Sequence, residues 1–389
     1  MYRCQETMLE TQEEIIMPLG QSKEARAYCG PSRYVQGPGE FNNLPVFAAN
    51  YGKSALAIVD TFFYKEFSET IPKLFAEHGM TAYTVEFSGG CSDVVLEKLL
   101  KFVETLPEIP DTFIGIGGGQ ACDINKAVGG HFGKAFFSVP TALATDAPTS
   151  THTILHNADG LPHRIIHKKN PDYVVVDTDI AVKAPVSMLI SGIGDALATY
   201  IEAQASYAAN NVCNAAGGKY KPTMLGMAVA KLSYDVLLEK GRAAVMAARE
   251  HVRTPAFEDV AEAAVLLSGL GFENTGISIS HGMEAAFHVL PGKRMLHGMG
   301  VGYGILIQLI IENDLERFAE IFDFCRDVGL PVCSADVGMT PENRDEYITK
   351  VVDEAFDNRW NVRNMPIYIS KDMLRGAMYY LDAYAAEHR

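Results

Sequence analysis

Apolar positions in the first half of the chain fall into continuous runs separated by stretches of helical spacing. The continuous runs predict buried strands at 54–60, 81–87, 112–116, 135–139 and 173–176. The spacing between these runs predicts helices at 61–78 and 95–103 and one that opens at 123–128. Continuous apolar strands that alternate with helices are typical of a parallel sheet covered on both faces. The pattern therefore predicts an α/β, Rossmann-like domain.

The second half of the chain has almost no strand pattern and is rich in Ala, Leu and Glu. Helical spacing predicts helices over 185–209, 222–240, 257–270, 280–289, 302–313, 315–328 and 345–357. The pattern changes near 181–185. We therefore divide the chain into an N-terminal extension at 1–30, an α/β domain at 31–183 and an all-α domain at 184–389. A cleft between two such domains is a natural place for a ligand site.

Composition narrows the classes of partner. The chain has 389 residues, 48% of them apolar, and its 33 basic and 48 acidic residues give a net charge of −15. Phosphate contacts need basic groups, so this acidity argues against general binding of nucleic acid or of anionic membrane surfaces. The closest approach to a spanning segment, 303–311, is nine residues long and contains Gln308. A membrane-spanning helix needs about 18 apolar residues, so we expect no membrane span. Together with the acidic charge, this leads us to expect neither nucleic acid nor a membrane as a partner.

Cysteine usage and the first residues bear on the cellular compartment. The chain has seven cysteines and no C-x-x-C pair, which argues against a disulfide framework or a structural zinc finger. The first fifteen residues contain four glutamates and one arginine. Secretory signals begin with basic residues, and transit peptides are rich in arginine and poor in acidic residues. We therefore expect a cytoplasmic protein.

A glycine turn after the third predicted strand is a candidate phosphate site. Gly117, Gly118 and Gly119 lie between a strand and a helix, where bare backbone and free helical N–H groups suit an anion. The spacing does not meet the strict G-x-G-x-x-G pattern, and a purely structural turn fits equally well. Asp60 ends the first predicted strand. It can accept hydrogen bonds from a ribose, or simply cap the following helix.

The helical half offers candidate metal ligands. Asp195 lies within an apolar predicted helix, and His281 and His297 flank a short segment further along the chain. Two imidazoles, one carboxylate and a water form a common catalytic zinc site. Spacing alone leaves the alternative open that Asp195 is a paired or capping carboxylate and that both histidines are ordinary residues.

Six segments in register resemble one known family. They are 30–37, 115–127, 140–150, 191–199, the pair 280–283 and 296–298, and 328–332. The chain resembles the group III, iron-containing type of metal-dependent alcohol dehydrogenases, and within them the glycerol dehydrogenases. The resemblance covers most of the chain. It implies the dehydroquinate synthase-like architecture of that family, with an NAD-binding α/β domain followed by a helical metal-binding domain.

The resemblance implies roles for individual residues. Asp195, His281 and His297 match the metal ligands, and Thr199 stands where iron-type relatives have a histidine as fourth ligand. Asp146 matches a catalytic carboxylate beside the substrate. The matched cofactor positions are Asp60, Gly118, Gly119, Gln120, Thr141, Ala144, Ser150, His152 and His156. At three of them the residue departs from the family, which usually has Lys at 120, an apolar residue at 152 and Tyr at 156.

The expected activity follows from this resemblance. It implies NAD-dependent oxidation of a small polyol, glycerol or a similar vicinal diol, to the hydroxyketone at one divalent metal, zinc, per subunit of a homo-oligomer. His152 and His156 leave open a different hydroxy compound, such as a 2-hydroxy acid or a larger polyol. A dehydroquinate synthase-like lyase is a further alternative. The absence of Lys and Arg from 188–209 argues against a phosphorylated substrate.

Overall fold

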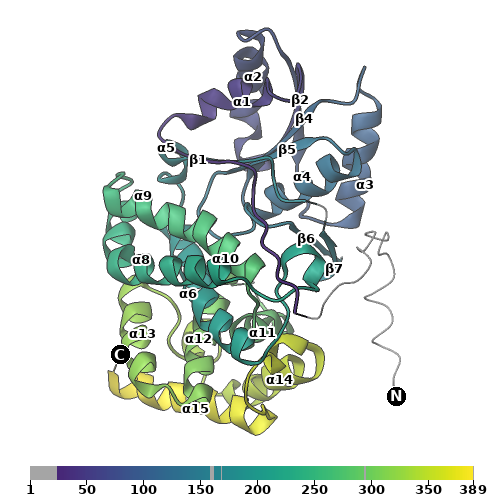
Figure 1. Cartoon of the computed structure of the whole chain (residues 1–389). Coiled ribbons are helices and arrows are strands. Elements are labelled where there is room, and N and C mark those ends of the chain that lie inside the picture. The colour runs from purple at the N-terminus through teal and green to yellow at the C-terminus, as the bar shows by residue number, and fades with distance from the viewer. Residues whose placement is uncertain (1–23, 158–161, 168, 293–294, 389) are drawn as a thin grey trace.

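The protein consists of an α/β part followed by a helical part (Figure 1). A computed structural model describes residues 24–157, 162–167, 169–292 and 295–388. The proposed N-terminal extension is therefore described only from residue 24, and the leading fifteen residues lie outside the described part. The predicted order, a parallel sheet with covering helices and then an all-helical region, is confirmed.

The α/β part is built on one parallel sheet with the strand order β1-β8-β5-β4-β2-β3. The strands are β1 (Tyr34–Gly37), β2 (Ser54–Asp60), β3 (Thr81–Phe87), β4 (Thr112–Gly117), β5 (Ala135–Pro140) and β8 (Tyr173–Asp177). The sequence predicted all of these except β1. That strand is short and only partly buried at the edge of the sheet, so it lacks a continuous apolar run.

Helices cover both faces of this sheet because alternate residues of each strand point to opposite sides. In β2, Ala57 and Val59 pack on the side of Phe67 and its helix, whereas Leu56 and Ile58 pack on the other side. The covering helices are α1 (Leu44–Ala48), α2 (Thr61–Ala76), α3 (Asp93–Glu104) and α4 (Gly119–His131). Burial on both faces explains why the strands are apolar at nearly every position.

An antiparallel hairpin follows the fifth strand of the sheet and lies beside the helical part (Figure 1). It consists of β6 (His152–His156) and β7 (Pro162–His167), and His152 pairs with His167. The connection from β5 to this hairpin contains three of the predicted cofactor positions, Thr141, Ala144 and Ser150, and β6 contains two more, His152 and His156. The chain then returns to the sheet through β8.

The helical part packs around the long helix α6, which lies against both α8 and α12. Its helices are α6 (Val186–Ala208), α7 (Ala215–Gly218), α8 (Met224–Arg249), α9 (Pro255–Glu262), α10 (Ser268–Asn274), α11 (Ile279–Ala286), α12 (His297–Glu312), α13 (Leu315–Val328), α14 (Arg344–Asn358) and α15 (Lys371–His388). The short helix α5 (Thr178–Ala181) precedes them and contacts β1 and β8 of the sheet. Among the described residues, none of these helices is long and apolar enough to cross a membrane.

Two helices differ from the sequence prediction, one in its extent and one because it was not predicted. The α12 helix begins at His297, five positions before the predicted start at 302, because glycines at 298, 300 and 302 mask the helical pattern. These glycines are used for close packing of α12 against α6 and α11. The last helix, α15, was not predicted, although its buried residues Leu374, Met378 and Leu381 recur at helical spacing.

Candidate metal and cofactor site

Three predicted metal ligands from three helices meet at one point. Asp195 lies in the middle of α6, His281 in α11, and His297 is the first residue of α12. The Asp195 Oδ1 atom lies 3.4 Å from His281 Nε2 and 3.3 Å from His297 Nε2. Ligands placed tetrahedrally around zinc at bond lengths of roughly 2.0–2.1 Å are separated by about 3.4 Å. The donor set and these two distances therefore suit a divalent ion, and the three ligand atoms all lie within 4.8 Å of one another.

Both imidazoles are oriented by further carboxylates on their other ring nitrogen. Glu202, two turns after Asp195 on α6, lies 2.5 Å from His281 Nδ1 and also accepts the backbone N–H of His281 at 3.0 Å. Glu284 lies 3.2 Å from His297 Nδ1. A carboxylate on Nδ1 holds the proton there and leaves Nε2 free to bind a metal.

Changing Glu202 to Gln is expected to weaken metal binding by roughly 10- to 100-fold. The glutamine oxygen can still accept the backbone N–H of His281, but its amino group then donates to Nδ1. That contact places the ring proton on Nε2, the atom that should bind the metal. Competition with a chromogenic chelator measures the affinity, with the exposed Glu69→Gln as control. Equal affinities of Glu202→Gln and the wild type would contradict this account.

The electrostatics of the cluster favour a cation. Burial alone would lower the pKa of His281, but the carboxylates of Glu202 and Asp195 raise it to about 10. The pKa of His297 is likewise raised, because Glu284 and Asp195 outweigh its burial. The His297 side chain is 41% exposed, so the cluster opens toward solvent beside this residue.

Asp146, the predicted catalytic carboxylate, lies directly beside the metal cluster. Its backbone N–H donates to Asp195 Oδ2 at 3.3 Å, and its own Oδ2 accepts from Ser268 Oγ at 2.7 Å. Burial and the neighbouring charge of Asp195 raise the pKa of Asp146 to about 7. The hydroxyl of Thr199 lies 3.0 Å from Ser268 Oγ. Because Ser268 uses its only proton on Asp146, Thr199 is the donor in this second bond.

The carboxyl ends of β2 and β4 form the predicted phosphate-binding edge. Asp60 caps α2 by accepting the N–H of Phe62 at 2.9 Å, and Gly117 has a left-handed φ of 152°. A Cβ on Gly117 would lie 2.7 Å from Asp60 Cβ, so only glycine fits. A Cβ on Gly118, at the start of α4, would meet nothing within 4 Å. Open space at a helix N-terminus fits the phosphates of a dinucleotide.

The next predicted cofactor positions run from this edge toward the metal cluster. Gln120 Oε1 would lie 3.4 Å from a Cβ placed on Gly90, so it faces the loop after β3. The N–H of Thr141 donates to the carbonyl of Gly117 at 3.0 Å. The carbonyl of Ala144 accepts from Ser191 Oγ on α6 at 3.0 Å. Gly119 packs closely against Thr145 in the same connection.

The structure separates the two unusual histidines. The ring of His152 packs against Phe272 with a centroid distance of 5.0 Å, and Phe272 in turn lies 6.2 Å from the ring of His281. His156 instead faces the loop after β3, where its backbone N–H and its Nδ1 lie 2.8 and 3.2 Å from the carbonyl of Cys91. His152 is therefore on the side of the metal cluster and His156 is not.

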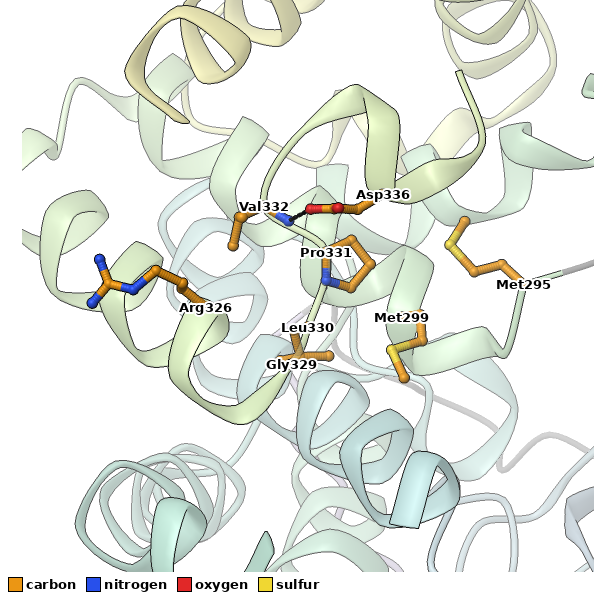
Figure 2. A pocket seen from close by; sticks show the side chains of 8 residues that line it. All are labelled: Met295, Met299, Arg326, Gly329, Leu330, Pro331, Val332 and Asp336. Carbon is orange, nitrogen blue, oxygen red and sulfur yellow. Dashed lines mark hydrogen bonds between the residues drawn. The ribbon is translucent and has the colours of Figure 1, made fainter. Parts of the chain in front are cut away.

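A hollow lined by residues of α12, α13 and the turn after α13 includes none of the predicted site residues. Figure 2 shows Pro331 at its centre, Met295 and Met299 on one side and the Arg326 side chain pointing outward on the other. Leu330, in the turn that lines this hollow, is 2.7 Å from the place of a Cβ on Gly194. The turn at 329–332 therefore packs against α6 at Gly194, the residue before Asp195.

Comparisons with known proteins agree with this geometry. The family model of iron-containing alcohol dehydrogenases matches residues 31–178. The glycerol dehydrogenase of Citrobacter freundii is 33% identical over 90% of this chain and 96% of its own length. That of Thermotoga maritima is 36% identical over 88% and 93%. The crystal structure of a probable glycerol dehydrogenase from Sinorhizobium meliloti superposes with a TM-score of 0.85, 33% identity, and coverage of 93% and 100%.

This chain belongs to the iron-containing alcohol dehydrogenase family. Sequence reasoning on this alcohol dehydrogenase missed several charged residues around the site, namely the buried Lys126, Glu202 and Glu273 and the partly buried Glu284. The position of Glu202, seven residues after Asp195, places it on the same helical face and was a usable signal. Glu284, three residues after His281 on α11, was a similar signal, whereas Glu273 lies on α10, which carries none of the predicted site residues.

Proposed function

We propose that this chain oxidises a small, uncharged vicinal diol such as glycerol or 1,2-propanediol to the hydroxyketone, with NAD as hydride acceptor and zinc as the metal. The observation that carries the proposal is the convergence of Asp195, His281 and His297 within 4.8 Å of one another, directly beside Asp146. The glycerol dehydrogenase relatives support the substrate class.

The residues divide the work as follows. A divalent ion at the cluster supplies Lewis acidity that makes a hydroxyl proton easier to remove, and hydride acceptance belongs to the nicotinamide. Glu202 and Glu284 hold the two imidazoles in position. Asp146 accepts a hydrogen bond from a substrate hydroxyl, and Ser268 fixes the orientation of its carboxylate. Phe272 forms an apolar wall between His152 and the cluster.

The cofactor preference is expected to be NAD over NADP. Asp60 can bond a ribose 2′-OH, whereas its charge repels a 2′-phosphate, and no Lys or Arg lies at 59–64 to accommodate one. Asp60→Asn keeps a good cap for α2 and removes only the charge. It should reduce the NAD/NADP ratio of kcat/KM by at least about fivefold, the equivalent of about 1 kcal/mol of Coulomb repulsion at 4 Å in water. A wild type that uses both cofactors equally well would refute the assignment.

The substrate preference is expected to depend on Asp146. A site with a buried polar acceptor rejects analogues that lack the hydroxyl, so 1,2-propanediol should exceed 1-propanol in kcat/KM by at least about 100-fold. Asp146→Ala should narrow that ratio by roughly 10- to 100-fold, the effect of one hydrogen bond to a charged acceptor. Asp235→Ala, an exposed carboxylate on α8, is the control.

The same assay of NADH formation separates the alternatives. Equal turnover of 1-propanol and the diol would rule out the diol assignment. Lactate outperforming glycerol would favour a pocket reshaped toward 2-hydroxy acids by His152. A lyase would form no net NADH with any alcohol in the panel.

A further inference from the structure

Residues 147–152, between the sheet and the β6–β7 hairpin, are held from the α/β side by a buried lysine. Lys126 of α4 has a side chain that is only 2% exposed. Its Nζ donates to the carbonyls of Ala147 at 2.8 Å and Ser150 at 3.1 Å, and also to that of His152. One ammonium group therefore gathers three carbonyls of a single short segment. Asp123, one turn earlier, balances its charge at 2.8 Å.

The same segment is held from the helical side by a buried carboxylate of opposite charge. Glu273 of α10 is fully buried. Its Oε1 accepts the backbone N–H of Thr151 at 2.9 Å and the Thr151 hydroxyl at 2.6 Å, and its Oε2 accepts Asn170 Nδ2 at 2.5 Å. Asn170 also donates to the carbonyl of Thr149 at 3.2 Å. Glu273 of the helical part thus binds hydrogen-bond donors of this segment, and Lys126 of the α/β part binds carbonyls of the same segment. Both charged side chains are buried and they belong to different halves of the chain.

The helix α10, which carries Glu273, also contacts residues of the candidate site directly. Ser268, at the start of α10, donates to Asp146, and Phe272 lies between the rings of His152 and His281. A shift of residues 149–152 relative to α10 therefore changes their separation from the metal cluster. A buried carboxylate is unfavourable unless its hydrogen bonds are satisfied. Thr151 of this segment gives Glu273 two hydrogen bonds, Asn170, which is bonded to the segment, gives it a third, and the Cys29 thiol also hydrogen-bonds to it.

We propose that Glu273 is a positioning residue for hydride transfer. Together with Lys126 it sets the position of residues 149–152, and so of a nicotinamide bound along Ser150 and His152, relative to Asp195 and the two histidine ligands. This assignment rests on the proposed function, because it uses NAD as the hydride acceptor, bound at the cofactor positions that the family resemblance implies. Misplacement of reacting groups by about 1 Å can cost roughly 100-fold in rate, so the position of this segment matters for turnover.

The variant that tests the proposal is Glu273→Gln. The glutamine oxygen can still accept from Thr151, but its amino group then faces the amino group of Asn170, and one hydrogen bond becomes a contact between two donors. We expect kcat for the diol to fall by roughly 10- to 100-fold. We also expect KM for NAD to rise and the primary deuterium isotope effect on kcat to increase, because hydride transfer becomes slower. Metal content per subunit should stay unchanged.

Two further measurements separate positioning from general stability. In cofactor-free protein, hydrogen exchange of the amides at 147–152 should be faster in Glu273→Gln. Glu258→Gln is the matched control, because Glu258 also bonds across the two halves, to Gln36 at 2.9 Å, without touching residues 147–152. It should leave kcat and the isotope effect unchanged. Thr151→Val should act in the same direction as Glu273→Gln but more weakly, and the double variant should be less than additive.

The outcomes are distinct. A Glu273→Gln variant with wild-type kcat, isotope effect and NADH affinity, differing only in Tm, would overturn the positioning role. So would a Glu258→Gln control that loses as much kcat. A wild type that fails to bind NADH in a fluorescence titration would contradict the proposed function itself, and this assignment with it.

Discussion

Replacing Asp195 by Asn is expected to abolish metal binding and turnover together. The amide keeps the size of the side chain but removes a negative charge that lies within 3.4 Å of both imidazole Nε2 atoms. Loss of an outer carboxylate already costs roughly 10- to 100-fold in metal affinity, so loss of a direct ligand should cost more than about 100-fold. Zinc content after dialysis and the rate of NADH formation measure the two effects.

The control for this variant is Asp235→Asn, an exposed carboxylate of α8 that pairs with Lys231. It should bind metal and turn over like the wild type. A chelator should inhibit the wild type, and zinc should restore the activity. If a thoroughly chelated, metal-free preparation kept full turnover, the metal assignment would be wrong.

Gly298→Ala is expected to reduce metal binding and turnover to an extent comparable with Asp195→Asn, but through a change in helix packing alone. A Cβ at position 298 would lie 1.7 Å from the carbonyl oxygen of Ser191 and 2.9 Å from the backbone nitrogen of Asp195. Both atoms belong to the backbone of α6, so no side-chain rotation relieves the clash. The helix α12 must move away from α6, and His297 moves with it. We expect loss of zinc and of turnover, with a destabilisation of about 1–3 kcal/mol or more.

Two other glycines make this prediction testable if Gly298→Ala does not fold. Gly376→Ala in α15 meets nothing within 4 Å, so it should keep full activity and gain roughly 0.5–1 kcal/mol of stability. Gly300→Ala would come closest to the side-chain Cγ of Glu284, at 2.9 Å, with the Cβ and Cα of Glu284 at 3.4 and 3.5 Å. It should disturb the partner of His297 mildly and lower zinc affinity less. Full zinc content in Gly298→Ala would show that this close helix contact does not position the ligands.

Much of the fold could be predicted because its signals are local. The strands β2 and β3 have the predicted bounds, since burial on both faces makes such strands apolar at nearly every position. The edge strand β1 was not predicted because its residues lack a continuous apolar run. The glycine-rich start of α12 was not predicted because it lacks a helical pattern of apolar residues. At these places the structure is decided by pairing and close packing with distant segments.

The sequence by itself determined the residue types of the candidate site, and the family resemblance selected Asp195, His281, His297 and Asp146 among them. Only the tertiary structure decided which buried carboxylates support these residues. Glu202 reaches His281 across 79 positions, and Glu273 reaches Thr151 across 122. Contacts of this kind depend on the angle and distance at which helices cross, which follow from side-chain packing rather than from any local pattern.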